Sequence, residues 1–233
     1  MRQPAAHKNT DQAPDGEKVP FVVVKRIREA ILDGVFKPGD HLTEGELVEK
    51  FEVSRSPIRE ALLALEKEGT LIISPYKGAI VKPLSPEEAS DIAELRLALI
   101  SLAVKPAHRH LSPADFDHAY ELAKRLTRTN SAKEHFEYNR LFWDSIFSKA
   151  RRPILREVFR QLEDRGTRYE PLLLKLFPAE TRPRQREVLI EMYRKGKIAE
   201  AFRAFKEIYL EIVDEVIEHL KSREPGDLSR RGL

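Results

Sequence analysis

The chain has 233 residues, and its 41 lysine and arginine residues against 38 aspartate and glutamate residues leave a formal net charge of only +3. Bulk charge therefore gives no argument for nucleic-acid binding. No apolar run reaches the roughly 18 residues of a membrane-spanning helix, and the absence of cysteine excludes disulfides, thiolate catalysis and cysteine-based zinc fingers. Because the first twenty residues lack the apolar stretch of a secretory signal, we expect a cytoplasmic protein without membrane contact.

The two ends of the chain have the composition of unfolded segments. Residues 1–19 are polar and contain Pro4, Pro14 and Gly16. Such a segment buries too little apolar surface to offset the entropy lost on ordering, so we expect a disordered arm there. Residues 223–233 have a similar composition, and we expect a flexible tail.

Residues 20–83 are predicted to form one small domain that starts with three helices. Apolar residues at helical spacing predict the first helix, which Gly34 ends. Thr43 with Glu46 three residues later is a capping box, which predicts a short second helix. Ser54 is a suitable first cap for a third helix, because a proline follows in the first turn, where a missing N–H costs nothing.

The same domain is predicted to end in a hairpin. Two short β-prone runs, at residues 71–73 and 79–81, flank a five-residue tip from Ser74 to Gly78. Three helices followed by a hairpin is the layout of a winged helix-turn-helix. At the tip, Lys77 and Gly78 pair a cation with a residue that lets the backbone approach closely, as a wing in the minor groove of DNA requires.

The start of the third helix carries the residues that point to function. Arg55 and Arg59 are four residues apart, so they project from one face. In a helix-turn-helix the first residues of the second helix meet base edges, and arginine can bond both O6 and N7 of guanine. Ser54 and Ser56 supply hydroxyl donors suited to phosphate. The alternative is that both arginines are ordinary exposed charges.

Beyond this domain the sequence shows only helical periodicity. Ser85 is a predicted N-cap, Pro86 occupies the first helical position, and Glu88 can close a capping box. We expect an independent antiparallel bundle of six or so helices over residues 84–222. Helix breaks are predicted near Pro106, Ser112-Pro113, Asn130-Ser131, Pro153, Pro171 to Pro183, and Gly196.

Residues 26–85 contain the turn PGD, then LTEGEL, VSRSPIREAL and the wing pair KG, in that order. This series resembles the DNA-binding domain of GntR-family bacterial repressors, whose members bind palindromic operators as homodimers. The resemblance implies base or phosphate contacts for the residues singled out above in the third helix and the wing. After Thr43-Glu44 the family usually has an arginine that also touches DNA, whereas this chain has Gly45.

Residues 88–220 resemble, less closely, the FCD type of effector domain found in the FadR subfamily. The similarity lies in ELR at 94–96, NRLFWDSIF at 139–147 and QREVLIEMYRKGKIAEA at 185–201. Many such domains hold a divalent metal with one Asp and three His, and a carboxylate effector completes the coordination. The four corresponding positions here are Asn139, Trp143, Arg186 and Ile208. Because all four are non-ligating or poor ligands, and arginine repels a cation, we expect no metal and no other cofactor.

The same replacements predict a metal-free pocket for an organic acid or acyl-type ligand. Arg186 can clamp a carboxylate bidentately, with Arg96 as a second anchor. Asn139 offers a donor and an acceptor, and Trp143 and Ile208 would line the pocket with apolar surface. The alternative is that Trp143 and Ile208 fill the old cavity and leave a constitutive DNA-binding protein.

We therefore predict a mainly α protein, with an N-terminal winged helix-turn-helix and a C-terminal helical effector-binding and dimerisation domain. Its predicted function is a ligand-responsive repressor that binds double-stranded DNA as a homodimer. An all-helical enzyme is a remote alternative, because the sequence has no nucleophile–base set and no HExxH motif. With only 10 glycines and none clustered, a phosphate-cradling loop is also not expected.

Overall fold

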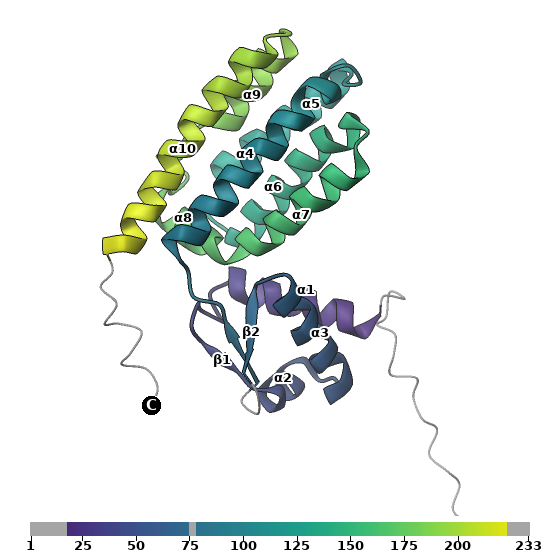
Figure 1. Ribbon diagram of the computed structural model, residues 1–233, viewed down its shortest axis with the longest axis vertical. Helices are drawn as coiled ribbons and strands as arrows, with labels where there is room; N and C mark the ends of the chain where they lie inside the picture. Colours follow the sequence, from purple (N-terminus) through teal and green to yellow (C-terminus); the bar gives the residue numbers. More distant parts are fainter. Residues whose placement is uncertain (1–17, 75–77, 223–233) are drawn as a thin grey trace, which may run out of the picture. The chain divides into compact units, whose positions relative to one another are not determined.

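The computed structural model describes residues 18–74 and 78–222 (Figure 1). The chain divides into two compact units. The first, here called the head, holds the residues up to Ile31 together with Phe36–Lys82. The second, here called the helical domain, holds Leu32–Val35 and the chain from Pro83 onward. The predicted tail, the wing residue Lys77 and residues 1–17 of the predicted arm lie outside the described residues.

The head is a winged helix-turn-helix, as the order of its predicted elements indicated. Three helices precede a three-stranded antiparallel sheet with the strand order β1-β3-β2. Ile80 of the central strand pairs with His41 on one side and with Ile72 on the other. The bounds are α1 Val19–Leu32, β1 His41–Leu42, α2 Glu44–Phe51, α3 Arg55–Lys67, β2 Leu71–Ser74 and β3 Gly78–Val81. Helix α1 thus begins at Val19, the last residue of the segment expected to be disordered.

One apolar core fixes the helices of the head. Ile27 of α1 and both Ile58 and Leu65 of α3 are fully buried in it. The capping box predicted for α2 is present, because Thr43 Oγ1 accepts from the backbone N–H of Glu46 (3.2 Å) and Glu46 Oε2 accepts from that of Thr43 (3.0 Å). Since α2 packs against α3, the core holds the buried face of α3 inward and leaves Arg55 and Ser56 of its first turn at the surface.

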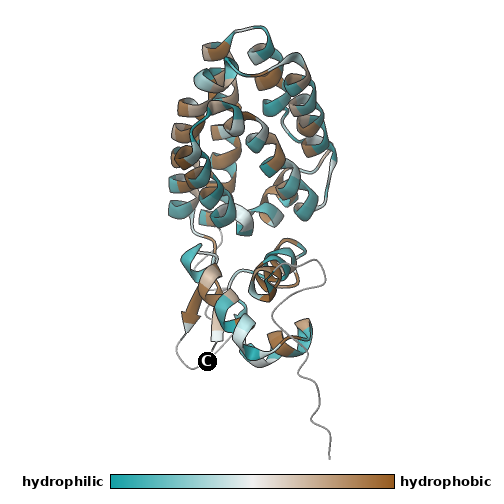
Figure 2. Ribbon diagram, turned by 90° about the vertical axis from the view of Figure 1, so that its right-hand side faces the viewer, coloured by the Kyte–Doolittle hydropathy of each residue, from teal (hydrophilic) through white to brown (hydrophobic). Residues whose placement is uncertain are grey.

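The helical domain contains seven α-helices and two short 3₁₀ helices in the described part of the chain (Figure 1). Several of these α-helices are amphipathic, with apolar and polar residues on different sides (Figure 2). No described helix is both long and apolar enough to cross a membrane. The bounds are α4 Pro86–His108, α5 Pro113–Arg128, α6 Ala132–Phe147, η1 Ser148–Ala150, α7 Pro153–Gly166, η2 Thr167–Tyr169, α8 Glu170–Leu176, α9 Gln185–Arg194 and α10 Ile198–Ser222.

Two local predictions for this domain are wrong. Pro106 does not break α4, which continues to His108. The backbone carbonyl of Leu102, which a proline at 106 leaves without its helical partner, lies 3.5 Å from the Arg152 guanidinium. Glu88 does not close a capping box with Ser85, because its carboxylate binds Arg168 at 2.8 Å. Ser85 still caps α4 through its own side chain.

Candidate DNA-reading surface and effector cavity

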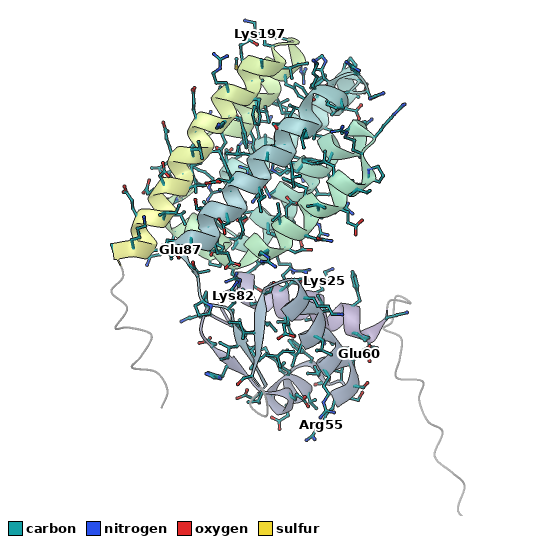
Figure 3. The ribbon with its side chains drawn as sticks, viewed as in Figure 1. Lys25, Arg55, Glu60, Lys82, Glu87 and Lys197 are labelled. Atoms are coloured by element: carbon teal, nitrogen blue, oxygen red, sulfur yellow. The ribbon has the colours of Figure 1, made fainter. Side chains whose placement is uncertain are left out.

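The first turn of α3 presents four polar side chains to the surface: Ser54, Arg55, Ser56 and Arg59 are all exposed. Arg55 points away from the body of the head (Figure 3). Ser54 occupies the N-cap position, yet its side chain makes no capping hydrogen bond. The hydroxyl is therefore not used by the helix itself. This turn has the exposure and the donor groups that a helix needs in order to enter a major groove.

Arg59 is held by a residue that the sequence analysis did not single out. Its Nε donates to both carboxylate oxygens of Glu44, at 2.8 and 3.0 Å. Glu44 is the first residue of α2, so this ion pair joins the two helices of the helix-turn-helix. Ser56 Oγ donates to Glu60 at 3.2 Å within α3. No local sequence pattern predicts this contact, because Arg59 and Glu44 are 15 residues apart.

Gly78 has a structural role in the sheet in addition to the wing contact predicted for it. It has a φ of +87°, and a Cβ placed on it would collide with the backbone carbonyl oxygen of Leu42 in β1. Only glycine allows β1 and β3 to approach so closely. Ser74 pairs with Gly78, so the tip comprises residues 75–77 and is shorter than the five residues predicted.

The helical domain contains a cavity of about 110 Å³. One water needs on the order of 10–15 Å³ on this measure, so the cavity has room for a small organic molecule. Its walls combine aliphatic side chains with a group of charged ones. The aliphatic residues include Ala89, Ile92 and Ala93 of α4 and Ile212, Val213 and Val216 of α10, and the charged or titratable ones are Arg96, His135, Glu170, Arg182 and Arg186.

Arg96 is the least satisfied of these charges. Its Nε is buried without a hydrogen-bond partner, and over the described ranges 18–74 and 78–222 its guanidinium has neither a hydrogen bond nor an ion pair. Its nearest defined contacts are the rings of Phe159 and Tyr209, whose centroids lie 5.5 and 6.0 Å from the guanidinium carbon. Burial alone would lower the pKa of Arg96, but the nearby groups Tyr209, Glu163 and Glu170 raise it above its ordinary value. The guanidinium therefore keeps its charge while its N–H donors are available to a ligand.

Two further arginines at the cavity are only partly satisfied. Arg186 Nη2 donates to Asn139 Oδ1 at 2.6 Å, while its Nε is buried without a partner in the described structure. Burial, followed by the nearby charge of Arg96, lowers the pKa of Arg186 to about 10. Arg182 donates to backbone carbonyls through Nε and Nη1. Its buried Nη2 has no hydrogen-bond partner in the described structure.

Two buried carboxylates balance part of this positive charge. Glu170 lies 2.6 Å from Nδ1 of His135. Burial alone would raise the pKa of Glu170, but His135, Arg96 and Arg186 lower it below its ordinary value. Glu163 accepts from Asn139 at 3.0 Å, and burial raises its pKa to about 8. With Glu163 protonated near neutral pH, the three arginines outnumber the ionised carboxylates.

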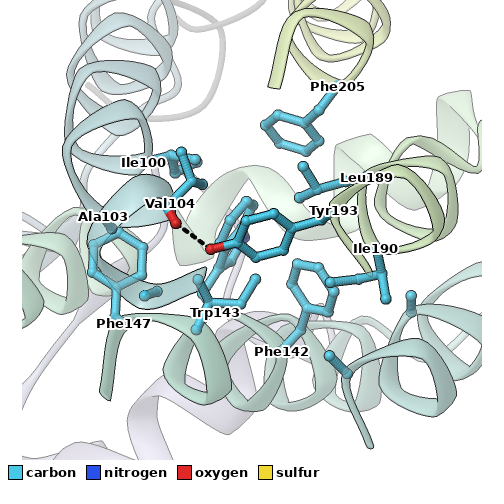
Figure 4. Packing of buried hydrophobic residues seen from close by; sticks show 14 of the residues in the cluster. Ile100, Ala103, Val104, Phe142, Trp143, Phe147, Leu189, Ile190, Tyr193 and Phe205 are labelled. Carbon is cyan, nitrogen blue, oxygen red and sulfur yellow. Dashed lines mark hydrogen bonds between the residues drawn. The ribbon is translucent and has the colours of Figure 1, made fainter. Parts of the chain in front are cut away.

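The structure brings together some of the predicted pocket residues and separates others. Arg96 and Arg186 line the cavity, whereas Asn139 is not among the lining residues and reaches the site only through its hydrogen bond from Arg186. Ile208 is not among the lining residues. Trp143 does not line the cavity either: it is 1% exposed in the main core, with its ring edge-on to Phe142 and Phe205 (Figure 4). The prediction that Trp143 lines the pocket is therefore wrong, because its large apolar ring is buried in the core.

Sequence reasoning missed three charged residues of the cavity. Arg182 comes from the loop before α9, His135 from α6 and Glu170 from the start of α8. They lie far apart in the sequence, and no spacing connects them. Among the residues that the structure describes, no group of three or more His, Cys, Asp or Glu could hold a metal ion.

Comparison with known proteins agrees with this arrangement. Residues 22–81 match the family described as bacterial regulatory proteins, gntR family, and residues 91–211 match the FCD domain. Over 107 residues the chain is 36% identical to the HTH-type transcriptional regulator YdhC of Bacillus subtilis (strain 168). This alignment covers 46% of each of the two chains. Over 132 residues it is 31% identical to the HTH-type transcriptional regulator McbR of Escherichia coli (strain K12), covering 55% of this chain and 60% of that one.

These alignments thus span about half the length of the curated relatives. A solved structure titled E. coli McbR/YncC extends the likeness, with a TM-score of 0.73 at 25% identity over 88% of this chain and 99% of that one. The fold and the site define a DNA-binding transcription regulator with a helical effector-binding domain, and not an enzyme. The chain belongs to the GntR family of bacterial regulators, with an FCD domain as its C-terminal part.

Proposed function

We propose that this regulator is a repressor that binds a palindromic operator as a homodimer and responds to a small organic anion held in the cavity of its helical domain. The observation that carries the ligand is the guanidinium of Arg96, which lines the cavity and has neither a hydrogen bond nor an ion pair within the described residues. A carboxylate would supply two charge-assisted hydrogen bonds to it. No metal is needed for this binding.

On the DNA side, Arg55 and Arg59 read base edges, and Ser54 and Ser56 bind phosphate or base edges. Their exposure on the first turn of α3 supports these roles. Arg59 exchanges Glu44 for a base when DNA binds, whereas Arg55 forms no ion pair within the described chain. The wing contributes Lys77 and Gly78, of which Lys77 lies outside the described residues.

In the cavity, Arg96 is the primary anchor and Arg186 the secondary one. This order reverses the emphasis of the sequence analysis, because Arg186 already donates to Asn139. The aliphatic side chains of α4 and α10 would contact the apolar part of the ligand. The cavity also weakens the alternative of a constitutive regulator, since Trp143 fills the core beside the site rather than the site.

For the homodimer, a face formed by α4 and α7 offers a contact surface. Leu95 and Leu102 on α4 and Ile154 and Val158 on α7 are between 40% and 75% exposed. The two helices are packing neighbours, and Arg152, the residue before α7, approaches the carbonyl of Leu102. Large apolar side chains gathered on one face mark interaction surfaces, and a two-fold dimer matches the symmetry of a palindrome.

Titration calorimetry with hexanoate, a carboxylate with an apolar tail, tests the effector site. We expect Arg96→Leu to weaken hexanoate binding by at least about tenfold, since a charge-assisted hydrogen bond contributes roughly 1.5–3 kcal/mol. Arg109→Leu, which removes an exposed arginine at the end of the same helix, is the control. Thermal unfolding checks that both variants remain folded. Equal hexanoate affinity in wild type and Arg96→Leu contradicts the proposed anchor.

A further inference from the structure

We propose that Tyr169 couples the effector cavity to the connector that leads to the DNA-reading head. The connector consists of residues 82–85, between strand β3 and helix α4. This inference rests on the proposed function and names the residue through which the occupied cavity would act. Tyr169 is a positioning residue in this scheme: it lines the cavity and contacts no DNA.

The hydroxyl of Tyr169 binds both backbone groups of one connector residue. It donates to the carbonyl oxygen of Ser85 (3.0 Å) and accepts from the N–H of Ser85 (3.1 Å). Ser85 is also the N-cap of α4. A single side chain therefore fixes the point at which the connector becomes the first helix of the cavity wall.

The neighbouring Arg168 holds the connector from the same 3₁₀ helix. Its guanidinium donates to the carbonyl oxygen of Pro83 (2.9 Å) and to the carboxylate of Glu88 (2.8 Å). The side chain of Arg168 is fully buried. A buried ion pair that also satisfies a backbone carbonyl is rigid, so η2 and the connector move together.

On the side of the head, the connector begins directly after a hydrogen-bonded residue. Val81 is the last residue of β3, and the N–H of Lys82 donates to the carbonyl oxygen of Thr70 at 3.0 Å. Pro83, the next residue, is already held by Arg168. One peptide bond thus separates a backbone group bonded within the head from one bonded within the helical domain. In the proposed scheme, a shift of η2 reaches the last bonded residue of the head through this one bond.

The other side of η2 faces the proposed ligand. Tyr169 and Glu170 are consecutive cavity residues, and Ala89, one turn into α4, lines the same wall. The pair between Glu170 and His135 fixes the start of α8 directly after Tyr169. A ligand that displaces the ring of Tyr169 therefore alters the hydrogen bonds between Tyr169 and Ser85. The connector is then held differently in the free protein and in the ligand-bound protein.

The test replaces the unidentified ligand by side chains that fill the cavity from inside. Ala93→Leu on α4 and Ile212→Phe on α10 each enlarge a buried lining residue. Each is made in wild type, in Tyr169→Phe, which keeps the ring and removes the hydroxyl, and in Tyr120→Phe. The last is a matched control, because its hydroxyl donates to Glu191 on the surface. Affinity is measured for a duplex selected from a random library by the wild-type protein.

We expect each filling variant to change DNA affinity by at least about fivefold in wild type and in Tyr120→Phe, within the usual range of coupling between two sites. In Tyr169→Phe the same variants should change it by less than about twofold. Equal changes in all three backgrounds, or no change in wild type, overturn the inference. Circular dichroism checks folding, and the two fillers lie on different helices so that one misfolded variant does not decide the result.

The proposed function is tested separately, by the hexanoate affinity of wild type and Arg96→Leu. The filling variants in the three backgrounds test the coupling without any added ligand. If hexanoate binds and the fillers act alike with and without the Tyr169 hydroxyl, only the coupling role fails. If no hexanoate binding depends on Arg96, the effector site fails, whatever the fillers do.

Discussion

At the scale of single residues, Arg59 shows how a base-reading side chain is held in the free protein. Glu44 accepts two hydrogen bonds from its guanidinium at the surface of the head. Exposed ion pairs contribute little to stability, usually about 0–1 kcal/mol, so DNA can compete with Glu44 for Arg59. The ion pair therefore holds the arginine in place in the free protein, and breaking it costs little free energy.

Removal of Arg59 should affect DNA binding and not folding. We expect Arg59→Ala to lose about 1–3 kcal/mol of specific binding with a change in unfolding free energy below about 1 kcal/mol, since the lost pair is exposed. Fluorescence anisotropy with the selected duplex measures the first quantity and urea unfolding the second. Wild-type affinity in the variant would show that Arg59 does not read bases.

Glu163 should make the helical domain sensitive to pH. Burial raises its folded-state pKa to about 8, from an ordinary value of 4.5. The folded protein thus keeps a proton that the unfolded chain releases, so this contribution to stability is complete below pH 4.5 and is lost as the pH rises toward about 8.

Glu163→Gln, which mimics the protonated acid and can still accept from Asn139, should remove that loss. Between pH 5 and 8 we expect the variant to gain on the order of 3 kcal/mol of unfolding free energy relative to wild type. Urea unfolding at several pH values within this window measures the difference. Parallel pH profiles for the two proteins would show that Glu163 titrates normally.

At the scale of elements, the sequence predicts best where one local interaction decides the structure. The capping box of Thr43 and Glu46 is such a case, and α2 begins where it predicts. Strand β1 has only two residues, too few to show an alternating pattern, and exists because it pairs with β3. Glu88 was assigned to a local cap but binds Arg168, 80 residues away, and no local pattern carries that information.

The same distinction between local and tertiary information applies to the residues of the cavity. Arg96 and Arg186 could be placed together because the resemblance supplied an alignment with a known ligand site. Arg182, His135 and Glu170 reach the cavity only through tertiary packing, so no local sequence pattern indicates them. Trp143 was misplaced because the alignment fixes its position along α6, whereas the neighbouring aromatic rings decide that it packs in the core.

Gly45 is an element-scale feature that a substitution can exploit. It is the second residue of α2, and a Cβ placed on it would meet no atom within 4 Å. We expect Gly45→Arg to stabilise the head by up to about 1 kcal/mol, because glycine is a poor helix former. It should also increase DNA affinity and steepen its salt dependence by about one unit, by adding one phosphate contact.

Gly45→Ala is the control for Gly45→Arg. It should reproduce the gain in stability, read from thermal unfolding, without the gain in affinity, read from anisotropy at several salt concentrations. If both variants bind DNA as wild type does, position 45 does not face the duplex.

At the scale of the whole molecule, the exposed apolar face of α4 and α7 predicts how two copies associate. Ile154 is 75% exposed at its edge. We expect Ile154→Lys to shift the protein from dimer to monomer in light scattering at micromolar concentration, because a buried lysine without a partner is costly. Leu141→Lys, on an exposed leucine of α6, should leave the dimer intact. A dimeric Ile154→Lys variant would place the interface elsewhere.

The chain contains one tryptophan, and it lies at the centre of the helical domain. Intrinsic tryptophan emission therefore reports on this unit alone, and melting of the winged head is silent in it. Far-ultraviolet dichroism sees both units, so a gap between the two optical melting curves would measure how independently they unfold. The protein thus carries its own reporter for the half that is proposed to sense the ligand.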